Sequence, residues 1–97
     1  PGILPSKIEG QSASIENFDV YPNPSSDIFN ISFVSEEVQD LSIRVVNMLG
    51  EVIHTESLEK FVGEYTKQIN LKDYTKGVYF LEIVTNQGVV NKKIVLQ

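Results

Sequence analysis

The sequence predicts an all-β domain, built as a seven-stranded antiparallel sandwich. Short runs in which apolar and polar residues alternate recur along the chain, and they are rich in Val, Ile, Phe and Tyr. Turn-forming residues separate these runs, and Gly50, Gly63, Gly77 and Gly88 stand where hairpins need a positive φ. The 97 residues, 41% of them hydrophobic, suffice for one domain with a modest core.

Seven runs are expected to form strands, in the order 18–21, 28–34, 41–48, 51–58, 64–71, 77–85 and 89–97. The run 28–34 places Phe29, Ile31 and Phe33 on one face. The run 77–85 is apolar at nearly every position, as a central strand would be. Turns are predicted between the runs, at EEVQD, MLGE, KFVG, KDYTKG and TNQG.

The first 17 residues differ from the rest of the chain. PGILPSKIEGQSASIEN contains two prolines, two glycines and three serines, and it follows no period. We therefore predict a linker or arm over 1–17 and a folded domain over 18–97. Because the chain starts at Pro1 without a signal peptide, we expect it to be a piece of a longer protein. No apolar run is long enough to span a bilayer.

The net charge of −5 argues against nucleic-acid binding, which requires a basic face. Residues 1–59 hold two basic and ten acidic side chains, whereas residues 60–97 hold six lysines and three acidic side chains. This asymmetry favours an interaction surface near the C-terminal end, and random scatter over a small sheet is the alternative. Cysteine is absent, which excludes disulfides, thiolate chemistry and cysteine-based zinc sites.

The stretch YTKGVY, at 74–79, leads into the most apolar run. In Greek-key sandwiches, a tyrosine at such a corner donates a hydrogen bond to the backbone a few residues upstream. We therefore predict a structural Tyr79, with its ring in the core and its hydroxyl satisfied. A ligand-contacting Tyr79 is the alternative.

No combination of side chains predicts an enzyme. His54 is the only histidine, and neither a nucleophile in a Gly-x-Ser-x-Gly turn nor an aspartate aimed at it is evident. We interpret His54 as an exposed strand residue.

Asn23, Ser25 and Asp27 alternate like the start of a calcium loop, but the glycine and the glutamate that such a loop needs are missing. We interpret this stretch as a capped turn, with a weak cation site as the alternative. No metal and no cofactor are expected.

Four landmark stretches occur in an order that resembles a known family. They are YPNPSSDIFNI at 21–31, LSIRVVNMLGEVI at 41–53, INLKDYTKGVYFLEIVTNQG at 69–88 and KKIVLQ at 92–97. Together they resemble the C-terminal sorting domain, in its type A form, of proteins exported by the type IX (Por) secretion system of Bacteroidetes. The resemblance spans 21–97.

This resemblance implies an immunoglobulin-like, Greek-key sandwich that directs an upstream cargo across the outer membrane. A Sec signal would take the cargo into the periplasm, and export would bring it to the cell surface or the extracellular space. The implied partners are the outer-membrane translocon with its shuttle components and a sortase-like cysteine protease. The protease would cleave within 1–17, and the domain itself would have no catalytic activity.

The family's motif is carried over only where this sequence matches it. Val46 and Asn47 stand where the family more often has Tyr and Asp, and Tyr74 stands where it usually has Leu. The matching positions are Pro22, Asn23 and Pro24; Gly50; Gly77, Val78 and Tyr79; and Lys92, Lys93, Ile94 and Val95.

Two further interpretations stand beside the sorting domain. A carbohydrate- or protein-binding appendage of a secreted enzyme, immunoglobulin- or fibronectin-like, would display exposed aromatic side chains, whereas those here mostly look core-directed.

Lys92 and Lys93 are expected to face opposite sides of the last run. The alternative to a receptor contact is that both lysines are solvated and discourage aggregation at an edge strand. We also expect that an exposed edge strand would allow copies to associate with one another.

Overall fold

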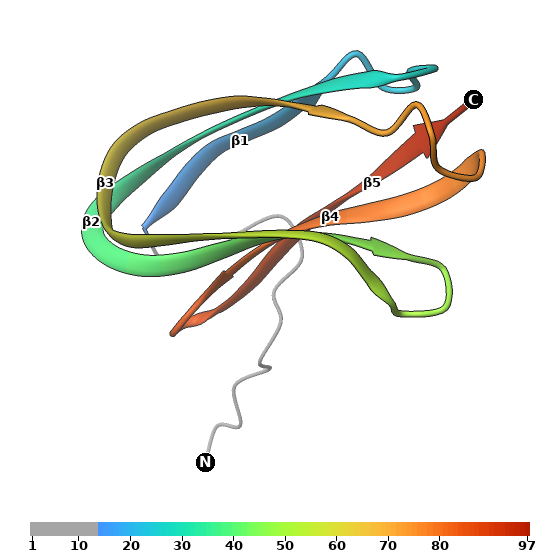
Figure 1. The fold of residues 1–97 in the computed structure, drawn as a ribbon. Coiled ribbons are helices and arrows are strands. Elements are labelled where there is room, and N and C mark those ends of the chain that lie inside the picture. Colours follow the sequence, from blue (N-terminus) through green and yellow to red (C-terminus); the bar gives the residue numbers. More distant parts are fainter. Residues whose placement is uncertain (1–13) are drawn as a thin grey trace.

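The computed structural model describes residues 14–97, which form five antiparallel strands (Figure 1). Their bounds are β1 Ile15–Tyr21, β2 Ile28–Asn47, β3 Val52–Asn70, β4 Gly77–Thr85 and β5 Gly88–Leu96. The prediction of an all-β, antiparallel domain is confirmed. In the range that the structure describes there is no helix, and hence none that could cross a membrane.

The strands form one sheet that curls back on itself and so makes two facing layers (Figure 1). The first half of β2 pairs with β1 on one side and with the second half of β3 on the other. The second half of β2 pairs with the first half of β3 and with β4, and β5 lies beside β4. Because β2 and β3 belong to both layers, a single sheet can enclose the core.

The prediction of seven strands was wrong, because two pairs of predicted strands are continuous. The runs 28–34 and 41–48 are the two halves of β2, and the runs 51–58 and 64–71 are the two halves of β3. The predicted turns EEVQD and KFVG are bends within these long strands. The other three turns reverse the chain as predicted.

The corner of the curled sheet, residues 35–41 of β2 and 58–64 of β3, is bent by irregularities in both strands. The register of β2 against β3 shifts between Ser35 and Gln39 and again before Leu41. In β3, Lys60 and Gly63 have φ values of 50° and 102°. A bend of this kind exposes polar residues on a continuous strand, so in the sequence it has the composition of a turn.

The first strand begins at Ile15, three residues earlier than predicted. Ile15 is buried, and Asn17 has a φ of 57° where the register shifts between Glu16 and Asp19. This bulge interrupts the alternation, which explains why the strand start was missed. The predicted linker thus loses its last residues to β1, and its residues 1–13 lie outside the described range.

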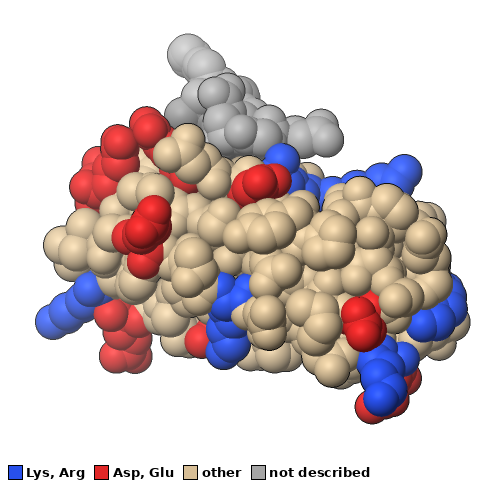
Figure 2. All heavy atoms as spheres, turned by 90° about the horizontal axis from the view of Figure 1, so that it is seen from above, with Lys and Arg blue, Asp and Glu red and all other residues tan. Residues whose placement is uncertain are grey.

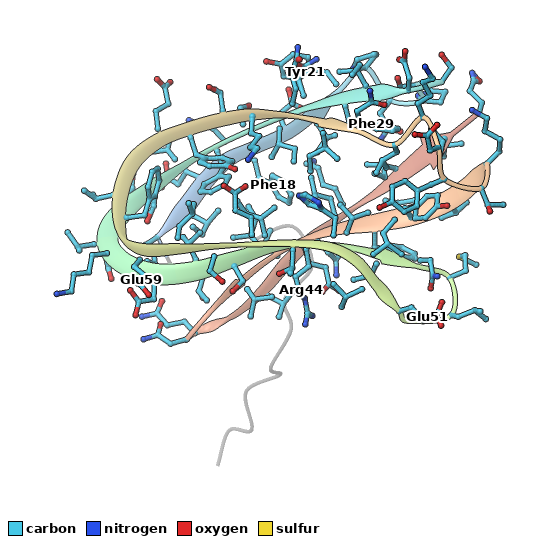
Figure 3. All side chains as sticks on the ribbon, viewed as in Figure 1. Phe18, Tyr21, Phe29, Arg44, Glu51 and Glu59 are labelled. Atoms are coloured by element: carbon cyan, nitrogen blue, oxygen red, sulfur yellow. The ribbon has the colours of Figure 1, made fainter. Side chains whose placement is uncertain are left out.

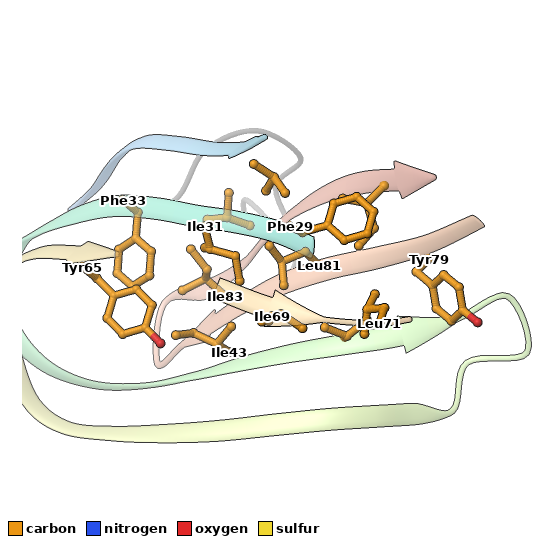
Figure 4. Close-up of a cluster of buried hydrophobic side chains, with 14 of the residues drawn as sticks. Phe29, Ile31, Phe33, Ile43, Tyr65, Ile69, Leu71, Tyr79, Leu81 and Ile83 are labelled. Atoms are coloured by element: carbon orange, nitrogen blue, oxygen red, sulfur yellow. The ribbon is translucent and has the colours of Figure 1, made fainter. Parts of the chain in front are cut away.

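The core lies between the two layers (Figure 4). Phe29, Ile31 and Phe33 share the inner face of β2 as predicted, each 1% exposed. Near the corner, the Phe33 and Tyr65 rings stack with centroids 4.9 Å apart, and Phe61 packs edge-on against both. The remaining buried hydrophobic residues are Ile15, Val20, Leu41, Ile43, Val45, Ile69, Leu71, Tyr79, Leu81, Ile83, Val90, Ile94 and Leu96.

Edges remain on the sheet formed by residues 14–97. Strand β1 pairs only with β2, and the long strand β3 also pairs only with β2. Lys60 and Gly63 interrupt the β3 edge with positive φ values, which makes it irregular. Association of copies through such an edge stays a prediction.

Candidate functional site

The four landmark stretches come together at the end of the sheet opposite the corner, hereafter the landmark end (Figure 1). The segment before β2, the turn between β2 and β3, the start of β4 and the end of β5 all lie there. The third and fourth stretches pair directly, with Gly77 opposite Leu96 and Val78 opposite Val95. Residues that are far apart in the sequence therefore share one part of the surface.

The segment before β2 runs along the outer edge of β5 and joins the first landmark stretch to the fourth. The Asn23 side-chain amide donates from Nδ2 to the carbonyl of Lys93 (2.9 Å) and accepts at Oδ1 from the N–H of Val95 (3.0 Å). The N–H of Ser25 donates to the carbonyl of Val95 (3.1 Å), and the N–H of Gln97 donates to the carbonyl of Ser25 (2.9 Å). These four hydrogen bonds, hereafter the latch, satisfy backbone groups on the outer edge of β5 from Lys93 to Gln97.

Two prolines position the Asn23 side chain. Pro22 and Pro24 flank Asn23, and both follow cis peptide bonds. Each proline ring fixes its own φ, and Pro24 also restricts the backbone of the residue before it. All three residues are exposed, so they are not held by core packing. The Pro-Asn-Pro sequence therefore presents an amide group to the edge of β5 at little entropic cost.

The residues after Pro24 form the predicted capped turn. The Ser25 hydroxyl donates to the carbonyl of Ile28 (2.6 Å), and Asp27 Oδ1 accepts from the N–H of Ile28 (2.6 Å). These oxygens thus serve the backbone of the turn, as expected for Ser and Asp at such positions. Residues 14–97 hold no group of three or more His, Cys, Asp or Glu side chains that is able to bind a metal ion.

The third landmark stretch confirms the predicted tyrosine corner. The Tyr79 hydroxyl donates to the carbonyl of Thr75, four residues upstream, and the ring is 5% exposed. Gly77 has a φ of 149°, a backbone conformation that residues with a side chain rarely adopt. Val78 points to the other side of β4, where it is half-buried opposite Val95. Tyr79 is therefore structural, and Val78 belongs to the outer face of the layer.

The second landmark stretch forms the turn between β2 and β3. Gly50 has a φ of 85° and donates its N–H to the carbonyl of Asn47 (3.0 Å). Asn47 Oδ1 accepts from the N–H groups of Leu49 (2.9 Å) and Glu51 (3.0 Å). A cavity of about 300 Å³ lies between this turn and the loop that carries Tyr74. These hydrogen bonds define the turn, which contributes to the surface of the landmark end.

In the fourth landmark stretch, alternate side chains have different environments. Lys92 points to the inner side, where Nζ lies 5.6 Å from the ring centroid of Phe18, a side chain between the layers (Figure 3). Lys93 is exposed on the outer side. Ile94 is a core residue at 1% exposure, and Val95 is half-buried on the outer face. The prediction that the two lysines face opposite sides is confirmed.

One charged group was missed by the sequence analysis. The Tyr65 hydroxyl donates to Glu56 Oε1 (2.7 Å), and Lys67 Nζ lies 3.2 Å from the same oxygen. Burial alone would raise the pKa of Glu56, but hydrogen bonds from Tyr65 and Lys67 outweigh it and lower the pKa below its ordinary value. Burial, together with Glu56, raises the pKa of Tyr65. The group connects the two halves of β3, and no local spacing signals it.

A second charged pair lies on the outer face. Arg44 and Glu82 stand directly opposite each other on β2 and β4, with Arg44 Nη2 2.5 Å from Glu82 Oε1. Figure 3 shows Arg44 pointing away from the core. His54, opposite Val45, is half-buried, so the prediction that it is exposed was wrong.

The fold and the landmark end define a class of protein, a small curled β-sheet domain whose four landmark stretches meet at one end. The family model of the secretion system C-terminal sorting domain matches residues 19–97. Beta-agarase D of Zobellia galactanivorans is 34% identical over 93 residues, which cover 95% of this chain and 17% of that protein. The chain belongs to the family of secretion system C-terminal sorting domains.

Family membership makes this domain a type IX secretion sorting signal on a secreted cargo. Such cargo is exported to the cell surface or the extracellular space. The alternative of a carbohydrate- or protein-binding appendage is not favoured. Phe29, Phe33, Tyr65 and Tyr79 are buried, which agrees with this assignment because a glycan platform needs exposed rings.

Proposed function

We propose that the landmark end is the part of the domain that docks on the outer-membrane translocon and its shuttle components. The observation that carries this proposal is the latch, because it joins the first and fourth landmark stretches into one surface. The exposed or half-buried positions of that surface include Asn23, Lys93 and Val95. In this proposal the domain is recognised and has no catalytic role.

We further propose that the cargo passes through the periplasm and that a sortase-like cysteine protease removes the domain by cleavage within 1–17. The position of β1 supports this arrangement. Ile15 pairs with Ser35 at the corner, whereas Tyr21 pairs with Asn30 toward the landmark end. Strand β1 therefore begins at the corner, at the opposite end from the proposed docking surface, and this placement supports cleavage upstream of β1.

We infer that the curled sheet is an immunoglobulin-like, Greek-key sandwich in which each half of β2 and β3 counts as a strand. The two layers and the bend that divides both long strands support this inference. The hydrogen bond from Tyr79 to Thr75 supports it as well, since tyrosine corners are typical of such sandwiches.

An export assay tests the docking proposal. The 97-residue chain is fused after a reporter that carries a periplasmic signal, in a Bacteroidetes host with a type IX system. The intact chain is expected to bring the reporter to the surface, and deletion of 92–97 is expected to abolish this, since it removes the latch partner and Ile94. Glu59→Gln, at the corner, is the matched control and is expected to export normally. Unchanged export of the truncated fusion would refute docking through the landmark end.

A further inference from the structure

The last strand is held in the folded sheet along both of its edges. On one edge, Tyr79 pairs with Ile94 and Gly77 pairs with Leu96. On the other edge, the latch occupies the carbonyls of Lys93 and Val95 and the N–H groups of Val95 and Gln97. A receptor that added a strand to this edge would need those same backbone groups. It would first have to displace the latch.

Burial restricts the side chains that a receptor can reach. Ile94 and Leu96 are each 1% exposed and belong to the core. Lys93 and Val95 point to the outer face, where they stand opposite Phe80 and Val78 on β4. The accessible part of the last strand is thus the pair Lys93 and Val95, set beside two half-buried apolar side chains.

We propose that the receptor reads the last strand in its folded form, through Lys93 and Val95, and that Asn23 is the positioning residue that holds this strand in place. The proposal rests on the docking function above and names the part of the landmark end that is read. No acidic side chain of residues 14–97 forms an ion pair with Lys93. The partner surface is therefore an apolar patch of the outer-membrane receptor with a carboxylate at its rim, complementary to the valines and the lysine.

Lys92 has a different role. Its ammonium group lies on the inner side, over the Phe18 ring, and so away from the outer face of β4 and β5. If the receptor instead read the last residues as an extended tail, Lys92 would leave the inner side and be as accessible to the receptor as Lys93. The latch would then oppose recognition, because the strand would have to leave the sheet before binding. The two modes of reading therefore predict opposite effects of weakening the latch.

Amide hydrogen exchange on the 97-residue chain tests the positioning role without export. Asn23→Ala removes both side-chain hydrogen bonds, and the N–H of Val95 is expected to exchange about three- to ten-fold faster. Asn23→Asp keeps an acceptor for Val95 and is expected to give a smaller increase. The N–H of Ile43, in the core of β2, serves as the internal control and is expected to be unchanged. Unaltered exchange at Val95 in Asn23→Ala would overturn the positioning role.

Reporter export then tests the mode of reading. Asn23→Ala is expected to lower surface export about three- to ten-fold, with Asn23→Asp between it and the unsubstituted chain. Lys93→Gln and Val95→Ser are expected to lower export, and Lys92→Gln, on the inner side, is expected to leave it unchanged. Export by Asn23→Ala that equals or exceeds the unsubstituted level, or equal losses in Lys92→Gln and Lys93→Gln, would refute the folded reading. Failure of the unsubstituted fusion would instead refute the sorting function, and the exchange result at Val95 would still stand.

Discussion

At the scale of single residues, two polar contacts of this domain join parts of the chain that are distant in sequence. Asn23 reaches the last strand, and Tyr65 reaches Glu56 across the two halves of β3. Asn23 bonds to exposed backbone groups of β5, whereas Tyr65 bonds to a partly buried carboxylate. Tyr79, by contrast, bonds to Thr75 only four residues away, and for that reason its role was predictable.

The Glu56 group makes stability depend on pH. The pKa of Glu56 is lower in the folded state than its ordinary value of 4.5, so its stabilising contribution is complete above that pH and is lost as the pH falls through the folded value. We expect Tyr65→Phe to lower the free energy of unfolding by about 1 kcal/mol at neutral pH. We expect this difference to shrink as the pH falls below the ordinary pKa of 4.5 and Glu56 becomes protonated. Urea unfolding of both proteins at several pH values measures this difference in the free energy of unfolding. A difference that does not change with pH would contradict the prediction.

At the scale of elements, the corner decides how many strands the domain has. The charged and polar residues around it, Glu36, Glu37 and Asp40 in β2 and Glu59 in β3, interrupt the alternation. In the sequence this interruption resembles two turns, whereas both strands continue and bend together. Hydrogen bonding between two strands that bend at the same place is a property of the pair, and neither run by itself reveals it.

The bend of β3 is expected to depend on Gly63. Its φ of 102° is a conformation that other residues rarely adopt, although nothing lies within 4 Å of where a Cβ would stand. Gly63→Ala is therefore expected to cost about 1–3 kcal/mol from backbone strain, without a steric clash. Ser57→Ala, at an exposed position of the same strand, is the control and is expected to cost less. Urea unfolding compares the two, and equal stabilities would show that the bend does not require this conformation.

At the scale of the whole molecule, the charge asymmetry of the sequence becomes an asymmetry along the long axis. Acidic side chains gather at the corner, while lysines occur mainly toward the landmark end (Figure 2). The corner also receives the upstream chain through Ile15, whereas the landmark end presents Lys93. The interaction surface predicted near the C-terminal end stays a prediction, and the lysines toward the landmark end agree with it.

Repulsion between carboxylates at the corner is expected to lower the stability of the domain slightly. Glu16 raises the pKa of Glu36, which shows that the two carboxylates repel each other. Glu36→Gln is expected to raise the melting temperature at low salt, and the gain is expected to shrink at high salt because salt screens exposed charges. Lys72→Gln, which removes a positive charge from an acidic protein, is the control and is expected not to raise it. The measurement is thermal unfolding at two salt concentrations. An unchanged melting temperature of Glu36→Gln at low salt would contradict the prediction.

The sequence by itself determined the all-β class, the inner faces of the strands, the tyrosine corner and the family, because alternation, local turns and ordered motifs are properties of short stretches. Only the tertiary structure decided that β2 and β3 are continuous, that Lys92 lies over the Phe18 ring, and that Asn23 bonds to the last strand. These features depend on contacts between residues far apart in the chain. Such contacts exist only after the sheet has curled and brought its first and last segments together.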